Sequence, residues 1–108
     1  MDKTIRAELD KLTQLIINAI PVEQIYLFGS HASGKPHKDS DLDLYVVLKD
    51  EVQLRDIDAA IKIRLAICEH QSMPIDLLVM KNSQYLKRKA APTLERKMAR
   101  EGMLLYGA

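Results

Sequence analysis

The sequence has 108 residues, 47% of them hydrophobic and 29% charged, which is typical of one globular domain over residues 1–108 with a modest core. Its formal net charge of +1 gives no overall attraction to nucleic acid or membrane, and its single cysteine, Cys68, excludes an intrachain disulfide. No apolar run is long enough to cross a bilayer, and the charged first residues do not resemble a signal peptide, so we expect a cytoplasmic protein.

The first half of the chain contains one helical pattern and two strand patterns. Apolar residues recur at helical spacing over Asp2–Ala19, and Pro21 ends this helix. Glu23–Phe28 predicts a strand, and Asp41–Leu48 predicts a stronger one that contains β-branched residues. Residues 29–40 are rich in Gly, Ser, Pro, His and Lys and predict a loop. Because this connection is short, we expect the two strands to be antiparallel.

A second helix and a third strand follow. A helix over Val52–Glu69 is expected to turn one apolar face to the core, made of Leu54, Ile57, Ile61, Leu65 and Cys68. Pro74–Met80 predicts a strand. The helix before it permits a parallel crossover to the second strand.

The carboxyl-terminal region predicts more helix. Asn82 or Ser83 can cap a helix, which Pro92 interrupts or restarts and Gly102 ends. Met103–Tyr106 can form a short last strand. This order of elements favours an α/β fold (α+β in some classifications), with a mixed β-sheet and helices on one side of it.

Paired carboxylates open the second predicted strand. Asp41 and Asp43 should project from one face, because side chains alternate along a strand. Leu42 and Leu44 should then point into the core. Two close carboxylates repel each other unless a cation lies between them, and Mg²⁺ is commonly held by one or two carboxylates plus substrate phosphates. An acidic turn that simply leads into a strand explains this segment equally well, whereas a calcium loop is excluded because Leu44 occupies its glycine position.

A third aspartate, Asp76, interrupts the apolar segment Ile75–Val79. Buried aspartates are uncommon unless they are paired or bound to metal. If the third strand lies beside the second, Asp76 can face Asp41 and Asp43, and the three carboxylates can hold two divalent ions. One ion would lower the pKa of an attacking hydroxyl and the other would bridge a triphosphate. Taken alone, Asp76 is also compatible with a solvent-facing residue on an edge strand.

A glycine and a serine follow the first strand. Gly29 would let the backbone approach a phosphate closely, and the Ser30 hydroxyl with nearby amides could bind it. The segment Gly29–Lys35 also matches the start of a P-loop, G-x-x-x-x-G-K. Pro36 stands where a serine or threonine should open a helix, so we exclude the P-loop.

Four segments together resemble the minimal nucleotidyltransferases of the polymerase-β-like superfamily: GSHASG, SDLDLYVVL, PIDLLV and PTLERKMAREGMLLYG. The resemblance covers nearly the whole chain and implies a mixed sheet flanked by helices. It implies transfer of a nucleoside monophosphate, AMP from ATP, to a hydroxyl with release of pyrophosphate. Carried over by position, Gly29 and Ser30 would hold the phosphates. Asp41 and Asp43 would bind two Mg²⁺ ions, and Asp76 would bind the catalytic ion and help to activate the acceptor.

The resemblance also implies a protein partner, because such small domains commonly work with a separate helical protein. A HEPN-type toxin that is adenylylated on a tyrosine is the leading candidate, which would make the chain an MntA-type antitoxin. A subunit that modifies a small molecule or RNA held by another protein is a second possibility. A third is a module without catalysis that neutralises its partner by contact.

One position departs from the family. Many relatives carry Ala-Arg-Gly where this chain has Ala32-Ser33-Gly34, and Ser33 cannot bind phosphate bidentately as an arginine can. Lys35 or Lys38 could substitute as point charges.

Other polar residues are weaker candidates. His31, His37 and His70 lack the spacing of metal ligands and are expected in exposed loops. The basic residues between positions 87 and 100 are expected to form a solvated face, which could also meet an acidic partner or RNA.

Overall fold

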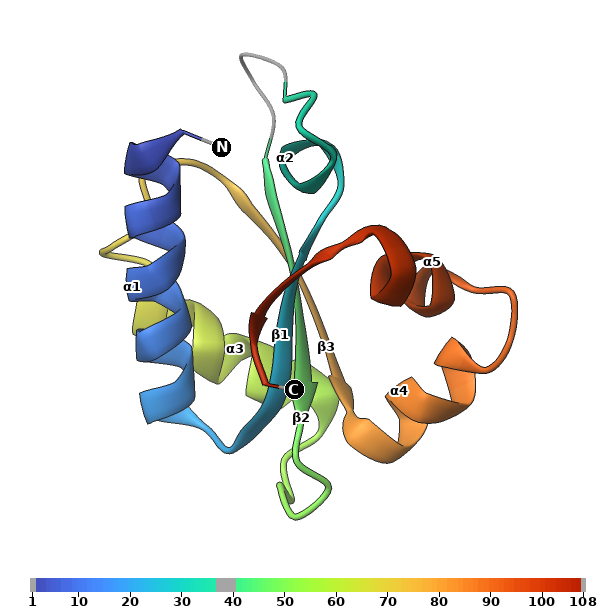
Figure 1. Ribbon diagram of the computed structural model, residues 1–108. Coiled ribbons are helices and arrows are strands. Elements are labelled where there is room, and N and C mark those ends of the chain that lie inside the picture. Colours follow the sequence, from blue (N-terminus) through green and yellow to red (C-terminus); the bar gives the residue numbers. More distant parts are fainter. Residues whose placement is uncertain (1, 37–40, 108) are drawn as a thin grey trace.

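A four-stranded mixed sheet in the order β3-β2-β1-β4 forms the centre of the protein (Figure 1). The computed structural model describes residues 2–36 and 41–107. The strands are β1 (Val22–Phe28), β2 (Leu42–Leu48), β3 (Ile75–Lys81) and β4 (Met103–Tyr106). β1 is antiparallel to both β2 and β4, and β2 is parallel to β3. The mixed sheet, the antiparallel first pair and the parallel crossover are thereby confirmed.

Helices cover both faces of this sheet (Figure 1). One layer consists of α1 (Lys3–Ala19) and α3 (Asp56–Ile67), and the other of α4 (Asn82–Lys89) and α5 (Leu94–Glu101). Our prediction of helices on one side only was wrong. β2 is apolar on both faces, with Leu44 and Val46 in one core cluster and Tyr45 and Val47 in another, so both faces need a cover. In the part of the chain that the structure describes, no helix has the length and apolarity needed to span a membrane.

The local sequence explains the start of α1 but not that of α4. α1 begins after Asp2, whose carboxylate accepts a 2.7 Å hydrogen bond from the amide of Thr4. α4 begins directly at Asn82 without a side-chain cap, so neither Asn82 nor Ser83 acts as predicted. The amide of Ser83 instead donates to Asp50 Oδ1 at 2.9 Å, which means that a distant residue satisfies this helix end.

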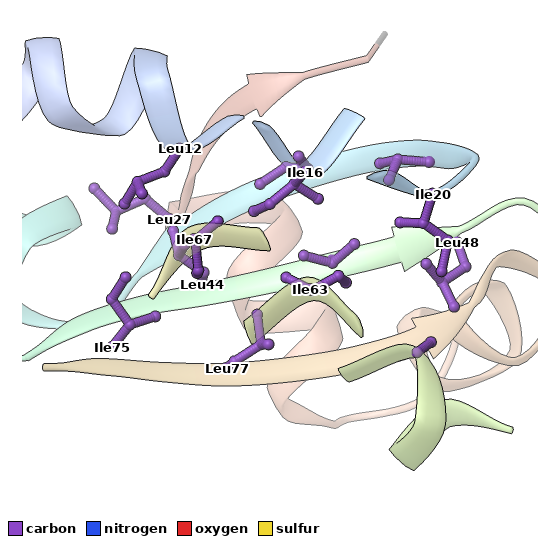
Figure 2. Close-up of a cluster of buried hydrophobic side chains, with 14 of the residues drawn as sticks. Leu12, Ile16, Ile20, Leu27, Leu44, Leu48, Ile63, Ile67, Ile75 and Leu77 are labelled. Atoms are coloured by element: carbon purple, nitrogen blue, oxygen red, sulfur yellow. The ribbon is translucent and has the colours of Figure 1, made fainter. Parts of the chain in front are cut away.

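The larger core cluster lies between the sheet and the layer of α1 and α3. Figure 2 shows side chains from α1, α3 and three strands meeting there. Those labelled are Leu12, Ile16, Ile20, Leu27, Leu44, Leu48, Ile63, Ile67, Ile75 and Leu77. Leu42 and Leu44 are buried on this side, as the alternation along β2 predicted. The residues of β2 that alternate with them, including Asp43, therefore face the layer of α4 and α5.

The orientation of α3 differs from our prediction. Ala59, Ile63 and Ile67 are fully buried, whereas Ile61 and Leu65 are 52% and 73% exposed. Both sets fit a helical period, because α3 is apolar on two sides. Periodicity alone therefore could not identify the face that packs on the sheet.

The smaller core cluster attaches α4 and α5 to the opposite face. It contains Tyr26, Tyr45, Val47, Tyr85 and Met98. The Tyr45 hydroxyl donates a 2.8 Å hydrogen bond to Glu95 Oε2, and Arg88 Nε donates to the same oxygen at 2.8 Å. Burial on its own raises the pKa of Glu95, but the hydrogen bonds from Arg88 and Tyr45 bring this pKa below its ordinary value. A buried carboxylate thus ties α5 to β2, the strand that carries Asp43.

Candidate active site

The turn after β1 brings the backbone against a carboxylate of β2. Gly29 has φ 76° and ψ −155°, a conformation available essentially only to glycine. A Cβ atom at this position would lie 2.1 Å from Asp43 Oδ2, so Gly29 is in direct contact with the Asp43 carboxylate. A glycine is required here both by its backbone angles and by this close approach.

A short helix, α2 (Ser30–Ser33), follows this turn where we expected only a loop. The amide of Ser33 donates to the carbonyl of Gly29 at 3.1 Å, and the Ser33 hydroxyl donates to the carbonyl of Ser30 at 3.0 Å. Ser30, the predicted phosphate ligand, is therefore the first residue of a hydrogen-bonded turn next to Asp43. The left-handed Gly34 ends this helix.

The strand register places the predicted carboxylates together. Asp43 pairs with Phe28 of β1 on one side and with Asp76 of β3 on the other. Residues paired in register project from the same face of a sheet, so the Asp43 and Asp76 side chains share a face. Asp41 lies one residue before β2 begins, and it is close enough to Asp43 for its charge to raise the pKa of Asp43. Asp76 is exposed on β3, an edge strand of the sheet, as the solvent-facing alternative expected, but it shares its face with Asp43.

The charges of these residues influence one another. Burial raises the pKa of Asp43 above its ordinary value, and the nearby carboxylates of Asp76 and Asp41 raise it further. His31 acts in the opposite direction. A carboxylate that is partly desolvated and repelled by two others is a favourable place for a cation.

Oxygen ligands of this kind suit magnesium. Mg²⁺ takes one or two protein carboxylates and completes its shell with water and substrate phosphates. Within residues 2–36 and 41–107, no three Asp, Glu, His or Cys side chains are close enough together to bind one metal ion. The donor chemistry and the shared face of Asp43 and Asp76 fit the ion, while the role of all three aspartates as its ligands stays a prediction.

His31 is the residue that sequence reasoning misjudged. It is only 8% exposed, because α2 turns its side chain inward, and it is close enough to Asp43 to influence its pKa. The expectation of an exposed loop histidine was wrong, since the helical character of SHAS was not recognised. His70 is exposed as expected, and His37 lies outside the described residues.

A cleft of about 290 Å³ opens beside Gly29, between α2 and α5. It is lined by Phe28, Gly29, Ala32, Ser33, Leu94, Lys97, Met98, Glu101 and Gly102. Sequence reasoning did not connect α5 with the Gly-Ser turn, because these segments are more than sixty positions apart in the chain. Lys35, one of the two lysines expected near the phosphates, is exposed at the end of α2, and Lys38 lies outside the described residues.

Comparison with known proteins identifies a matching family and solved structures of similar fold. A family model described as "Polymerase beta, Nucleotidyltransferase" matches residues 10–108. No curated protein matches the chain significantly.

Several solved structures have the same fold. A toxin–antitoxin complex with AMP-PNP matches with a TM-score of 0.65 and 25% identity, covering 93% of this chain and 73% of that chain. A mutant of the toxin–antitoxin MntA–HpeT matches with a TM-score of 0.64 and 27% identity, covering 92% and 72% of the two chains. A candidate nucleotidyltransferase from Sulfolobus solfataricus matches with a TM-score of 0.60 and 16% identity, covering 94% and 78%.

Proposed function

The chain belongs to the polymerase β nucleotidyltransferase family, and we propose that it transfers AMP from ATP to a hydroxyl group of a partner protein in a magnesium-dependent reaction. The observation that carries this proposal is the contact of Gly29 with Asp43, which is itself in register with Asp76. The Gly29–Ser30 turn and two carboxylates thus meet at one end of the sheet. The toxin–antitoxin relative with AMP-PNP, an analogue of ATP, supports the choice of nucleotide.

Each residue has a distinct role in this proposal. Gly29 leaves room for a phosphate beside Asp43, and Ser30 offers its hydroxyl and amide to the β- and γ-phosphates. Asp41 and Asp43 would hold the two Mg²⁺ ions, whose charge would neutralise the triphosphate and lower the pKa of the acceptor hydroxyl. Asp76 takes part in binding the catalytic ion and helps the acceptor to lose its proton.

The reaction is a single displacement at phosphorus. The acceptor oxygen forms a bond to the α-phosphorus, the bond from that phosphorus to the oxygen bridging to the β-phosphate breaks, and pyrophosphate leaves. The hydroxyl proton passes toward Asp76 and then to solvent. In such a reaction the protein contributes mainly by positioning the reactants and by stabilising charge. In our proposal the groups around Asp43 do both.

A helical toxin of the HEPN type, modified on a tyrosine, is the acceptor that we propose. Two of the three solved structures described above are toxin–antitoxin proteins. The exposed apolar side chains of Ile57, Ile61 and Leu65 on α3 are consistent with a protein that associates with another chain.

The experiment is co-expression with the protein encoded by the adjacent gene, followed by mass spectrometry of that protein. Wild type and Asp10→Ala, which removes an exposed carboxylate of α1, should both add one or more AMP groups. Asp41→Ala/Asp43→Ala should still bind the partner but add none, because no ion remains to stabilise pyrophosphate. If wild type and both variants neutralise the partner equally and none of them modifies it, the chain is an antitoxin that acts by binding alone.

A further inference from the structure

The cleft between α2 and α5 contains a lysine that the proposed reaction has not used. Lys97 of α5 lines it together with Gly29 and Ser33. Among the described residues around the cleft it is the only cation, and it forms no ion pair with any of them. Its place beside the Gly-Ser turn suggests a negatively charged ligand.

The position of α5 is fixed by contacts that do not involve the ligand. Thr93 caps the helix, accepting a hydrogen bond from the amide of Arg96 at 3.3 Å. Glu95 is 3% exposed and is bonded to Tyr45 of β2, the strand that also carries Asp43. Lys97 therefore extends from a helix that is anchored to the same strand as the proposed metal site.

The direction of the cleft decides which part of a nucleotide it can receive. The reacting α-phosphate must lie at Asp43, and Gly29 separates Asp43 from the cleft by direct contact. The groups that continue from Gly29 along α2 are then the β- and γ-phosphates. Glu101, which also lines the cleft, is half exposed and lies 3.7 Å from Arg100, so its charge is partly balanced by a neighbour.

We propose that Lys97 binds the terminal phosphates of the triphosphate in this cleft and so determines the preference for a nucleoside triphosphate over a monophosphate. This inference rests on the proposed function and extends it to a residue in another helix. Ser33, which offers no positive charge, lines the same cleft opposite α5. Lys97 thus supplies the cation that the α2 side of the cleft lacks, in place of Lys35 or Lys38.

The test compares the binding of ATP and AMP by calorimetry in the presence of Mg²⁺. Lys97→Ala should weaken ATP binding about tenfold, the effect of losing one charge-assisted hydrogen bond, and should leave AMP binding unchanged. Lys62→Ala, which removes an exposed lysine of α3 on the opposite face of the sheet, should change neither. Ser33→Arg in the Lys97→Ala protein should restore ATP affinity, because an arginine there lines the same cleft.

Two results would overturn the inference and leave the proposed function intact. Equal losses of ATP and AMP affinity in Lys97→Ala would show that the cleft holds the nucleoside instead. Unchanged ATP affinity in Lys97→Ala, with loss in Asp43→Ala, would show that Lys97 takes no part. If wild type binds no ATP with Mg²⁺, the proposed function fails and the inference fails with it.

Discussion

The contact between Gly29 and Asp43 can be broken with a single methyl group. In Gly29→Ala the new Cβ would lie 2.1 Å from Asp43 Oδ2 and 3.0 Å from the Asp43 carboxyl carbon. The backbone at this position is held by the hydrogen bond from Ser33, so the carboxylate is the part that can move. We expect the Asp43 side chain to rotate away from Asp76.

The size of the effect follows from two separate costs. An alanine at φ 76° and ψ −155° costs about 1–3 kcal/mol of backbone strain. Forcing Asp43 from its preferred rotamer adds about 0.5–1.5 kcal/mol. The free energy of unfolding should therefore fall by about 1.5–4.5 kcal/mol in total. Displacing a metal ligand should weaken Mg²⁺-dependent ATP binding by about 10- to 100-fold.

Gly34→Ala is the matched control. Gly34 has φ 78° and ψ 16°, and a Cβ there would meet nothing within 4 Å. Its backbone cost should be about 1–2 kcal/mol, with no effect on ATP binding. Urea unfolding measures the stability of each protein, and calorimetry with ATP and Mg²⁺ measures the site.

A double mutant separates the two costs of Gly29→Ala. In an Asp43→Ala background the new Cβ no longer meets the Asp43 carboxylate. Gly29→Ala should then lower the free energy of unfolding only by the cost of backbone strain. If Gly29→Ala and Gly34→Ala bind ATP with equal affinity, the contact of Gly29 with Asp43 is not part of the site and our reasoning is refuted.

Three further predictions concern charge and packing. Burial and the neighbouring carboxylates raise the pKa of Asp43, so ionising this carboxyl group costs stability as the pH rises through and above the ordinary pKa of an aspartate. Asp43→Asn should therefore raise the melting temperature at pH 7 in EDTA. It should not do so at a pH low enough to protonate the Asp43 carboxylate. Glu95→Gln should lower the free energy of unfolding by about 1.5–3 kcal/mol at pH 7, because it weakens charged hydrogen bonds such as that from Tyr45. Since the pKa of Glu95 is lowered, the difference in unfolding free energy between wild type and Glu95→Gln should shrink as the pH falls through the titration of Glu95. A difference that stays constant with pH in urea unfolding would contradict this account. Ile63→Ala should cost about 2–5 kcal/mol and Ile61→Ala only about 0.5 kcal/mol in the same assay, and the reverse order would show that α3 packs by its other face.

The sequence was sufficient for the strands and for the shared face of Asp43 and Asp76, because these depend on local pattern and on the order of the elements. The apolar run of β2 and its alternation predicted that Leu42 is buried and that Asp43 projects from the opposite face. The single helix between β2 and β3 permitted a parallel pair, and the structure has this pair, with Asp43 in register with Asp76. Neither step required knowledge of distant contacts.

The features that the sequence did not reveal depend on contacts between distant segments. α3 has two apolar sides, and only its packing against the sheet selects Ile63 over Ile61. The second helical layer is held by the ion pair between the exposed Arg88 and the buried Glu95, which no periodicity indicates. The cleft that contains Lys97 exists only because α5 returns to the end of β1.

The most direct measurement of the central claim is a crystal structure with Mn²⁺ and AMP-PNP, in which anomalous scattering locates the metal. Our account predicts metal peaks at the Asp43 carboxylate, shared with Asp41 and Asp76, and at about 2.0–2.2 Å from their oxygen atoms, as for Mg²⁺ and similar divalent ions. The triphosphate should lie along Gly29. Metal bound away from Asp43, or a nucleotide bound without contact to Gly29, would contradict the account.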